Sequence, residues 1–324
     1  MTNLTFLVAD VGGTNTRVAL TRGGHVLPDT IRRFRNRDFA NLAPVLRTYR
    51  EEAGGHPDGA CVAVAGPVND DVAELTNLDW SIDVPRLTEA TGARHGAILN
   101  DLQAQAYALS QLPDTAVTEL VAAPAQPKAA RLVVGVGTGF NAAPVHETPT
   151  GHVVPPSEAG HANLPIRTSE DLRLCEFVST AHGFPAVEDV LSGRGLERVY
   201  RWLAAEDGST DEFLAAEIMA RLGTDPRADA ALGVFVRILG TVTGNLSLIH
   251  LPFGGVYLVG GVARAVGPHL QTHRFAEAFR DKGRFAGFMS NFPVFLVEDD
   301  FAALTGCAAH LSEKMASAGQ AATA

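Results

Sequence analysis

The chain has 324 residues, of which 46% are hydrophobic and 19% charged, which excludes a disordered or fibrous protein. This length predicts two lobes with a ligand cleft, as in a globular enzyme. The formal net charge of −10, the pI near 5.5 and the lack of a basic stripe argue against a nucleic-acid partner.

The first third of the chain predicts one α/β lobe. Short apolar or alternating runs, separated by glycine and by Pro28-Asp29, predict an antiparallel meander of strands at residues 4–13, 16–24 and 25–34. Helical spacing then predicts a helix at residues 39–53. Further strands and helices follow to residue 109: a strand at 59–68, a strand, turn and helix at 72–92, and a strand that passes into a helix at Asn100-Asp101.

A second strand pair with a glycine turn occurs at residues 131–145, "RLVVGVGTGFNAAPV". Residues 9–14 match residues 134–139 in pattern, because each segment gives a strand, a glycine turn and a second strand. The two copies are too far apart for a solenoid repeat. We therefore expect duplicated lobes.

The remainder of the chain is mainly helical over residues 168–250, with Ser169, Asp171 and Asp225 as expected helix caps. An apolar strand at 254–263 ends in Gly260-Gly261. A strand and a terminal helix are expected over 292–316.

The three cysteines, Cys61, Cys175 and Cys307, are widely separated in the sequence and have apolar neighbours. This spacing predicts buried thiols in a reducing compartment and supports neither a disulfide framework nor a zinc site. No run of eighteen apolar residues and no basic leader are apparent. We expect a cytoplasmic protein without a membrane partner.

The glycine turn in "VADVGGTNTRVAL" differs from the two commonest nucleotide-binding loops. A dinucleotide fingerprint and a Walker A loop both open a helix, whereas strand-like residues follow Gly12-Gly13. A lone hairpin of this kind is usually a tight turn. The second copy at residues 135–139 favours a pair of hairpins whose backbone N–H groups hold a polyphosphate.

Several polar residues are candidates for contact with a hydroxylated substrate. Asn100 and Asp101 follow an apolar strand, where they either cap a helix or place a carboxylate that takes a proton from a hydroxyl. Taken separately, Glu188 is typical of a solvated helix face and His161 of a loop. Together with Glu158, they predict a ring of donors and acceptors suited to a polyol.

The order of motifs resembles the bacterial glucokinase family, within the hexokinase, actin and heat-shock-ATPase superfamily. The resemblance runs through "VADVGGTNTRVAL", "AVAGPV", "TNLDW", "LNDLQAQAYAL", "GVGTGFNAAPV", "SEAGHANLP", "VLSGRGLERVY", "GGVYLVGGV" and "FRDKGRF". It implies an α/β fold of two ribonuclease-H-like (actin-like ATPase) lobes with a cleft between them. We expect a small lobe at residues 1–111 plus 302–324 and a large lobe at 112–301.

The resemblance also implies ATP-dependent phosphorylation of D-glucose to glucose 6-phosphate at the entry to glycolysis, with Mg²⁺ near Asp10 and homodimers as the assembly. Asp101 matches the catalytic base, which also contacts the sugar. The other implied sugar ligands are Asn100, Glu158, His161 and Glu188. The implied ATP-binding residues are Ala9, Asp10, Val11, Gly12, Gly13, Thr14, Gly137, Thr138, Gly139, Gly260 and Gly261.

Two positions depart from the family pattern: Asn141 and Ala159 each stand where the family usually has glycine. Both adjoin implied contacts, so the alternatives are a kinase for another hexose, such as mannose or an N-acetylated amino sugar, or a non-catalytic sugar sensor. A plain ATPase of the actin type would hydrolyse ATP without regard to sugar. The zinc-containing branch is disfavoured because no cysteine lies near His161 in the sequence.

Overall fold

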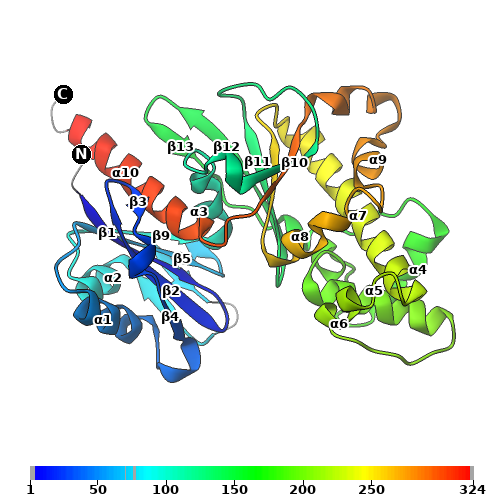
Figure 1. Ribbon diagram of the computed structural model, residues 1–324, viewed down its shortest axis with the longest axis horizontal. Helices are drawn as coiled ribbons and strands as arrows, with labels where there is room; N and C mark the ends of the chain where they lie inside the picture. The colour runs from blue at the N-terminus through cyan, green and yellow to red at the C-terminus, as the bar shows by residue number, and fades with distance from the viewer. Residues whose placement is uncertain (1–3, 70, 76–77, 322–324) are drawn as a thin grey trace. The chain divides into compact units, whose positions relative to one another are not determined.

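The structure, a computed structural model, describes residues 4–69, 71–75 and 78–321; Thr76 and Asn77 of the "TNLDW" motif therefore lie outside it. The chain packs into two compact units (Figure 1). Unit 1 comprises Met1–Pro113, Glu147–Pro156 and Asp299–Ala324. Unit 2 comprises Asp114–His146 and Ser157–Glu298.

The sheet of unit 1 has the strand order β3-β2-β1-β5-β9, with β4 also paired to β2. Its strands are β1 (Thr5–Val11), β2 (Asn15–Arg22), β3 (His25–Val26), β4 (Arg32–Arg35), β5 (Gly59–Val64) and β9 (His95–Asn100). Parallel pairing aligns Val11 with Val64 and Val64 with Asn100. The carboxyl ends of β1, β5 and β9 therefore share one edge of the sheet.

Two helical layers cover this sheet, with α1 (Leu42–Ala53) and α2 (Val84–Thr91) on one face and α3 (Asp101–Ala108) and α10 (Ala302–Ala321) on the other (Figure 1). Leu7 and Val11 of β1 pack with Leu46 and Leu87 in the first layer. A small antiparallel sheet is formed by β6 (Val68–Asn69), β7 (Val72–Glu74) and β8 (Ser81–Asp83). The strand expected at 25–34 is instead two short strands, because Pro28 begins a 3₁₀ turn between them.

The segment Glu147–Pro156 packs with unit 1, whereas the expected boundaries put it in the large lobe. It contains β13 (Gly151–Val153). His152 Nδ1 is 2.7 Å from Glu313 Oε1 of α10, and Gln103 Nε2 of α3 donates to the Val154 carbonyl over 2.9 Å. These contacts link the segment to the helical layer of α3 and α10.

The sheet of unit 2 repeats the plan of the first. Its strand order is β10-β15-β14-β11-β12-β13. The last residues of β12 and the whole of β13 belong to unit 1. The strands are β10 (Val117–Val121), β11 (Arg131–Val136), β12 (Phe140–Thr148), β14 (Val256–Val259) and β15 (Val294–Val297). As in unit 1, a three-strand meander is followed by two parallel strands, in agreement with the expected duplication.

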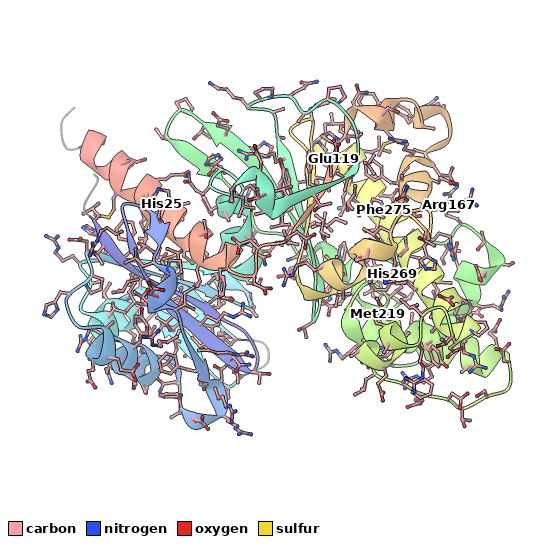
Figure 2. The ribbon with its side chains drawn as sticks, in the orientation of Figure 1. His25, Glu119, Arg167, Met219, His269 and Phe275 are labelled. Carbon is pink, nitrogen blue, oxygen red and sulfur yellow. The ribbon has the colours of Figure 1, made fainter. Side chains whose placement is uncertain are left out.

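The helices of unit 2 are α4 (Ser169–Ser179), α5 (Gly193–Glu206), α6 (Ala215–Ala220), α7 (Pro226–His250), α8 (Gly261–Val266) and α9 (Phe275–Arg280). Asp225 caps α7 as expected, but the N-cap of α4 is Thr168, not Ser169. Helix α7 has the length and apolarity to cross a membrane, yet 67% of its most apolar window is buried. Phe275 of α9, labelled in Figure 2, packs in the same core. These contacts are typical of a core helix.

The prediction of buried free thiols is confirmed for Cys61, Cys175 and Cys307. Cys61 on β5 and Cys307 on α10 are nevertheless neighbours, and burial together with the Cys61 thiol raises the pKa of Cys307 well above its usual value. Both thiols lie inside the core of unit 1.

Candidate functional site

The glycine turn between β1 and β2 is held by a buried asparagine. Gly12 N–H donates to the Asn15 carbonyl over 3.0 Å. Asn36, which is 1% exposed, donates from Nδ2 to the Gly12 carbonyl (2.7 Å) and from its backbone N–H to the Thr14 carbonyl (3.0 Å). Its Oδ1 accepts from the Thr16 hydroxyl over 2.8 Å. The turn is therefore fixed from one side by Asn36.

Gly13 and Thr14 are exposed at the tip of this turn, whereas the side chains of Ala9 and Val11 are buried in the sheet. The tip borders a pocket of about 500 Å³. The pocket is lined by Gly13, Thr14, Asn15, Arg35, Asn36, Arg37 and Leu78. Two guanidinium groups beside a glycine turn suit an anion such as a phosphate.

Sequence reasoning missed Arg35, Asn36 and Arg37. The available signal was the run "RRFRNRD", which concentrates four arginines within a strongly acidic chain.

Asp10 precedes the turn and faces Arg17 across the β1–β2 pair. Arg17 Nη1 lies 3.7 Å from Asp10 Oδ2, and the Asp10 side chain is 24% exposed. Burial raises the pKa of Asp10, and the Arg17 charge partly lowers it. Mg²⁺ in phosphotransfer sites is commonly held by one or two carboxylates plus substrate phosphates, so a single partly exposed carboxylate beside this glycine turn would fit the ion. No cluster of three or more His, Cys, Asp or Glu side chains suited to a metal occurs among the residues that the structure describes.

Asn100 and Asp101 lie where β9 ends and α3 begins. Asn100 Oδ1 accepts from Leu102 N–H over 3.0 Å in a capping box with Gln103, which confirms the helix-cap interpretation. Asn100 Nδ2 donates to the Gly66 carbonyl, also over 3.0 Å. Asp101 is half-buried, and its Oδ1 accepts from Leu102 N–H over 2.8 Å.

The second interpretation, that the Asp101 carboxylate takes a proton from a hydroxyl, stays a prediction, and the position of the pair on the sheet bears on it. Val11 at the end of β1 and Asn100 at the end of β9 are separated by one strand, which places them about 10 Å apart along the shared edge. The Asp101 carboxyl group and the glycine turn thus belong to the same edge of the unit 1 sheet.

In unit 2, the glycine turn between β11 and β12 contacts two helix starts. Gly137 N–H donates to the Gly139 carbonyl over 2.9 Å, and Gly193 N–H at the start of α5 donates to the Gly137 carbonyl over 3.0 Å. Gly260 has φ +103°, and a Cβ there would overlap the Val136 carbonyl, so this close approach requires glycine. The structure thus gathers these expected ATP-binding residues: Gly137, Thr138, Gly139, Gly260 and Gly261.

Glu188 is bonded to the end of this turn. Its Oε2 accepts from Phe140 N–H over 3.0 Å, and a Cβ at Gly139 would overlap the same oxygen. The Ser192 hydroxyl donates to the Glu188 carbonyl over 2.9 Å. The alternative of a solvated helix-face charge is therefore wrong for Glu188.

Glu158 and His161 are close neighbours on a second turn of unit 2. Their side chains are 64% and 67% exposed, and His161 Nε2 is 3.9 Å from Glu158 Oε2. Val187 N–H donates to the Ala162 carbonyl over 2.9 Å, which joins this turn to the one that carries Glu188. The carboxylates of Glu158 and Glu188 therefore lie on adjoining turns of unit 2.

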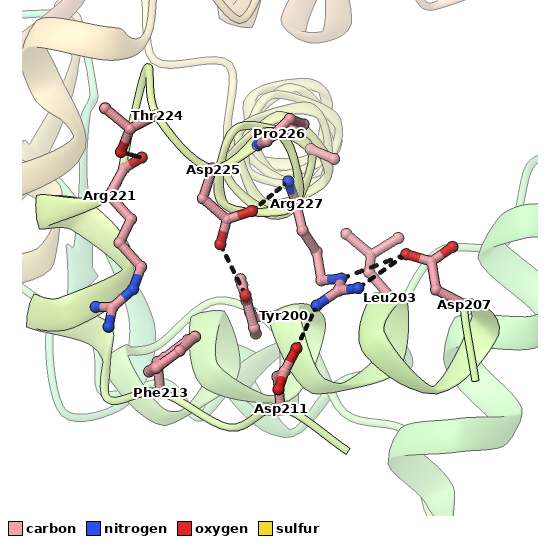
Figure 3. A pocket seen from close by; sticks show the side chains of 11 residues that line it. Tyr200, Leu203, Asp207, Asp211, Phe213, Arg221, Thr224, Asp225, Pro226 and Arg227 are labelled. Atoms are coloured by element: carbon pink, nitrogen blue, oxygen red, sulfur yellow. Dashed lines mark hydrogen bonds and ion pairs between the residues drawn. The ribbon is translucent and has the colours of Figure 1, made fainter. Parts of the chain in front are cut away.

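A larger pocket of about 800 Å³ lies between α5 and α7 and contains none of the expected site residues (Figure 3). Arg227 is 3.2 Å from Asp207 and 3.0 Å from Asp211, and the Tyr200 hydroxyl donates to Asp225 over 2.8 Å. Because these charges pair with one another, the pocket is better suited to stabilising unit 2 than to binding a charged ligand.

Comparison with known proteins agrees with the resemblance seen in the motifs. The family model described as Glucokinase matches residues 7–314. The chain is 33% identical to the glucokinase of Mesorhizobium japonicum over 94% of this chain and 90% of that protein. It also superposes on the crystal structure of a glucokinase from an Antarctic psychrotroph with a TM-score of 0.83 and 33% identity, covering 95% and 98% of the two chains.

A glucokinase from Balamuthia mandrillaris, solved in complex with glucose, has a TM-score of 0.79 over 94% of this chain and 92% of that one. At 23% identity, this likeness shows the fold alone. The solved relatives have the actin-like ATPase fold that the motifs imply. On the strength of the family match and the identity over nearly its whole length, the chain belongs to the glucokinase family.

Proposed function

We propose that this chain phosphorylates D-glucose with ATP to give glucose 6-phosphate and ADP. The observation that carries the proposal is the position of Asp101, at the end of β9 and on the same sheet edge as the glycine turn of β1 and β2. Membership of the glucokinase family supports glucose as the acceptor.

In the proposed reaction, the sugar 6-hydroxyl oxygen bonds to the γ-phosphorus of ATP, and Asp101 accepts the proton of that hydroxyl. The bond between the γ-phosphorus and the bridging oxygen breaks, and ADP leaves with that oxygen. The N–H groups of Gly12 and Gly137 are used within their own turns, so the phosphates would be held by backbone N–H groups of residues 13–14 and 138–139. Arg35 and Arg37 add positive charge near the first turn. Asp10 would hold Mg²⁺, which neutralises phosphate charge when bound.

Hydrogen bonds with Asn100, Glu158, His161 and Glu188 hold the sugar, and the two carboxylates accept from sugar hydroxyls. Asn100 already makes two bonds within unit 1, so its contribution is a fixed orientation. Glu188 bonds to Phe140 N–H next to the phosphate turn, so the same carboxylate would serve both substrates. A site built from such polar groups rejects sugars that lack a matching hydroxyl.

Steady-state kinetics in a coupled ADP assay tests this proposal. The acceptors are glucose, mannose and N-acetylglucosamine, and the donors are ATP, ADP and inorganic polyphosphate. We expect the highest kcat/KM for glucose with ATP. A higher kcat/KM for another hexose would make that hexose the substrate in place of glucose. Sugar binding without a phosphorylated product would favour a sugar sensor. ATP hydrolysis at a rate unaffected by sugar would favour a plain ATPase.

The proposal extends to a cytoplasmic location, a role at the entry to glycolysis and assembly as a homodimer. These parts rest on the family resemblance, and sedimentation equilibrium tests the assembly.

A further inference from the structure

Asn141, the second residue of β12, is bonded to both neighbours of Glu158. Its Nδ2 donates to the Ser157 carbonyl over 2.5 Å, and its Oδ1 accepts from Ala159 N–H over 3.0 Å. The same oxygen accepts from Ala142 N–H over 2.8 Å. One half-buried carboxamide therefore fixes the backbone immediately before and immediately after Glu158.

The backbone held in this way is irregular. Glu158 has φ −125° and ψ 50°, outside the helical and extended regions, and it precedes the 3₁₀ turn Ala159–His161. Because its side chain is 64% exposed, few other contacts restrain it. The direction of the carboxylate is thus set mainly by the turn and by the carboxamide that holds the turn.

Phe140, the residue before Asn141, holds the carboxylate of Glu188 in place. Phe140 N–H is the donor to Glu188 Oε2. The Phe140 carbonyl lies so close to Gly160 that a Cβ there would overlap it. Two consecutive residues of β12 therefore fix both turns that carry the acidic side chains.

We propose that Asn141 is a positioning residue for sugar binding, which sets the placement of Glu158 relative to Glu188 and so the discrimination between hexoses. The inference rests on the proposed role of Glu158 as a sugar ligand. Without the carboxamide, Ala159 N–H and the Ser157 carbonyl lose their partner and the turn loosens. Sugar binding then weakens, whereas ATP binding does not.

The test compares Asn141→Ala with Glu158→Ala and with the double variant. We expect Asn141→Ala to raise KM for glucose about tenfold, the equivalent of one or two lost hydrogen bonds, and to reduce the preference for glucose over mannose. KM for ATP and kcat at saturating glucose should stay within about twofold. Asn141→Asp keeps the acceptor oxygen but loses the donor, so we expect a smaller increase; it also serves if the alanine variant fails to fold.

The double variant separates positioning from general loss of structure. If Asn141 acts through Glu158, Glu158→Ala/Asn141→Ala has the glucose KM of Glu158→Ala alone, whereas fully additive effects would overturn the inference. The matched control is Asn291→Ala, which removes a similar bond to the Phe288 carbonyl (2.7 Å) at an exposed turn of unit 2 and should change no kinetic constant.

Two results would reject the inference in distinguishable ways. An unchanged glucose KM in Asn141→Ala, with a raised one in Glu158→Ala, rejects Asn141 alone. An unchanged KM in Glu158→Ala rejects the proposed sugar contact and the inference with it.

Discussion

Arg17 on β2 stands directly opposite Asp10 on β1, with Nη1 3.7 Å from Asp10 Oδ2. The guanidinium group is itself held in place, since Nη1 also donates to the Asp300 carbonyl over 3.0 Å. At 3.7 Å the Arg17 charge only partly offsets the cost of burying the carboxylate, whose pKa remains raised. A further cation beside Asp10 would therefore stabilise its ionised carboxylate.

The first prediction concerns Asp10→Asn. Burial raises the pKa of Asp10, so the folded state binds the proton more tightly than the unfolded chain. This group's contribution to stability therefore falls as pH rises from the usual pKa of the unfolded chain through the raised pKa of the folded protein. At pH 7 the raised pKa of Asp10 therefore lowers the stability of the fold. We therefore expect Asp10→Asn to raise Tm at pH 7 while turnover with Mg²⁺ and ATP is lost, measured by thermal unfolding and the coupled assay. Asp38→Asn, at a 59% exposed side chain, should alter neither, and a lower Tm for Asp10→Asn would contradict the argument.

The second prediction tests the base. In Asp101→Asn, the side-chain oxygen can still accept the hydrogen bond from Leu102 N–H, but the amide cannot take a proton. We expect kcat to fall by about 10² to 10⁴, with glucose affinity by calorimetry within about threefold of the original. Near-normal turnover would rule out Asp101 as the base.

The third prediction concerns the buried asparagine behind the first glycine turn. Asn36→Ala leaves the Gly12 carbonyl and the Thr16 hydroxyl without their partner, at a cost of about 1–3 kcal/mol in the free energy of unfolding. KM for ATP should rise and KM for glucose should not. The matched control is Asn41→Ala, which removes the exposed cap of α1 in the same unit and should cost about 1 kcal/mol without any change in KM for ATP. Equal kinetics in the two variants would contradict the positioning role.

The fourth prediction compares two glycines of unit 2. A Cβ at Gly160 would overlap the Phe140 carbonyl, whereas a Cβ at Gly287 meets no atom within 4 Å, and Gly287 has helical φ of −65°. Gly160→Ala should therefore destabilise the protein by about 1–3 kcal/mol and raise KM for glucose, because the strand start and the turn must separate. Gly287→Ala should be neutral or slightly stabilising. Urea unfolding measures both, and similar midpoints would refute the packing argument.

The fifth prediction concerns acid stability. Burial lowers the pKa of His310 to about 4, and its ring lies 4.6 Å from that of Tyr107. The unfolded chain therefore binds the proton first, so stability is lost as pH falls from about 6.5 towards 4. His310→Leu should flatten the decline of Tm over this range, while His25→Leu, at an exposed position, should leave its slope unchanged. An unaltered slope in His310→Leu would show that other groups control acid unfolding.

Much of the placement of strands along the chain could be predicted because glycine marks the strand ends. The runs before Gly12, Gly66 and Gly137 are short, apolar and buried, and each forms the expected strand. The change from strand to helix at Asn100-Asp101 was also predicted, because the N-cap signal is local.

Contacts between distant segments could not be predicted in this way. Asn36 follows β4, whose pairing with β2 is a contact between separate segments. Glu188 resembles a surface charge in the sequence, and its donor is the N–H of Phe140, 48 residues earlier. The contact between Asn141 and Ala159, the two departures from the family pattern, likewise depends on the packing of β12 against the following turn. The catalytic and ligand roles of these residues stay predictions until the variants are measured.

Helix α10 covers the sheet that opens the chain. It packs on α3, β1 and β5, where the Cys307 thiol donates to the Ala9 carbonyl over 3.9 Å and Lys314 Nζ donates to the Gly96 carbonyl over 3.1 Å. During synthesis, the apolar face beneath α10 therefore stays uncovered until residues 302–321 have left the ribosome. Unit 1, whose first strands are translated before unit 2, therefore completes its fold only after unit 2 has been synthesised.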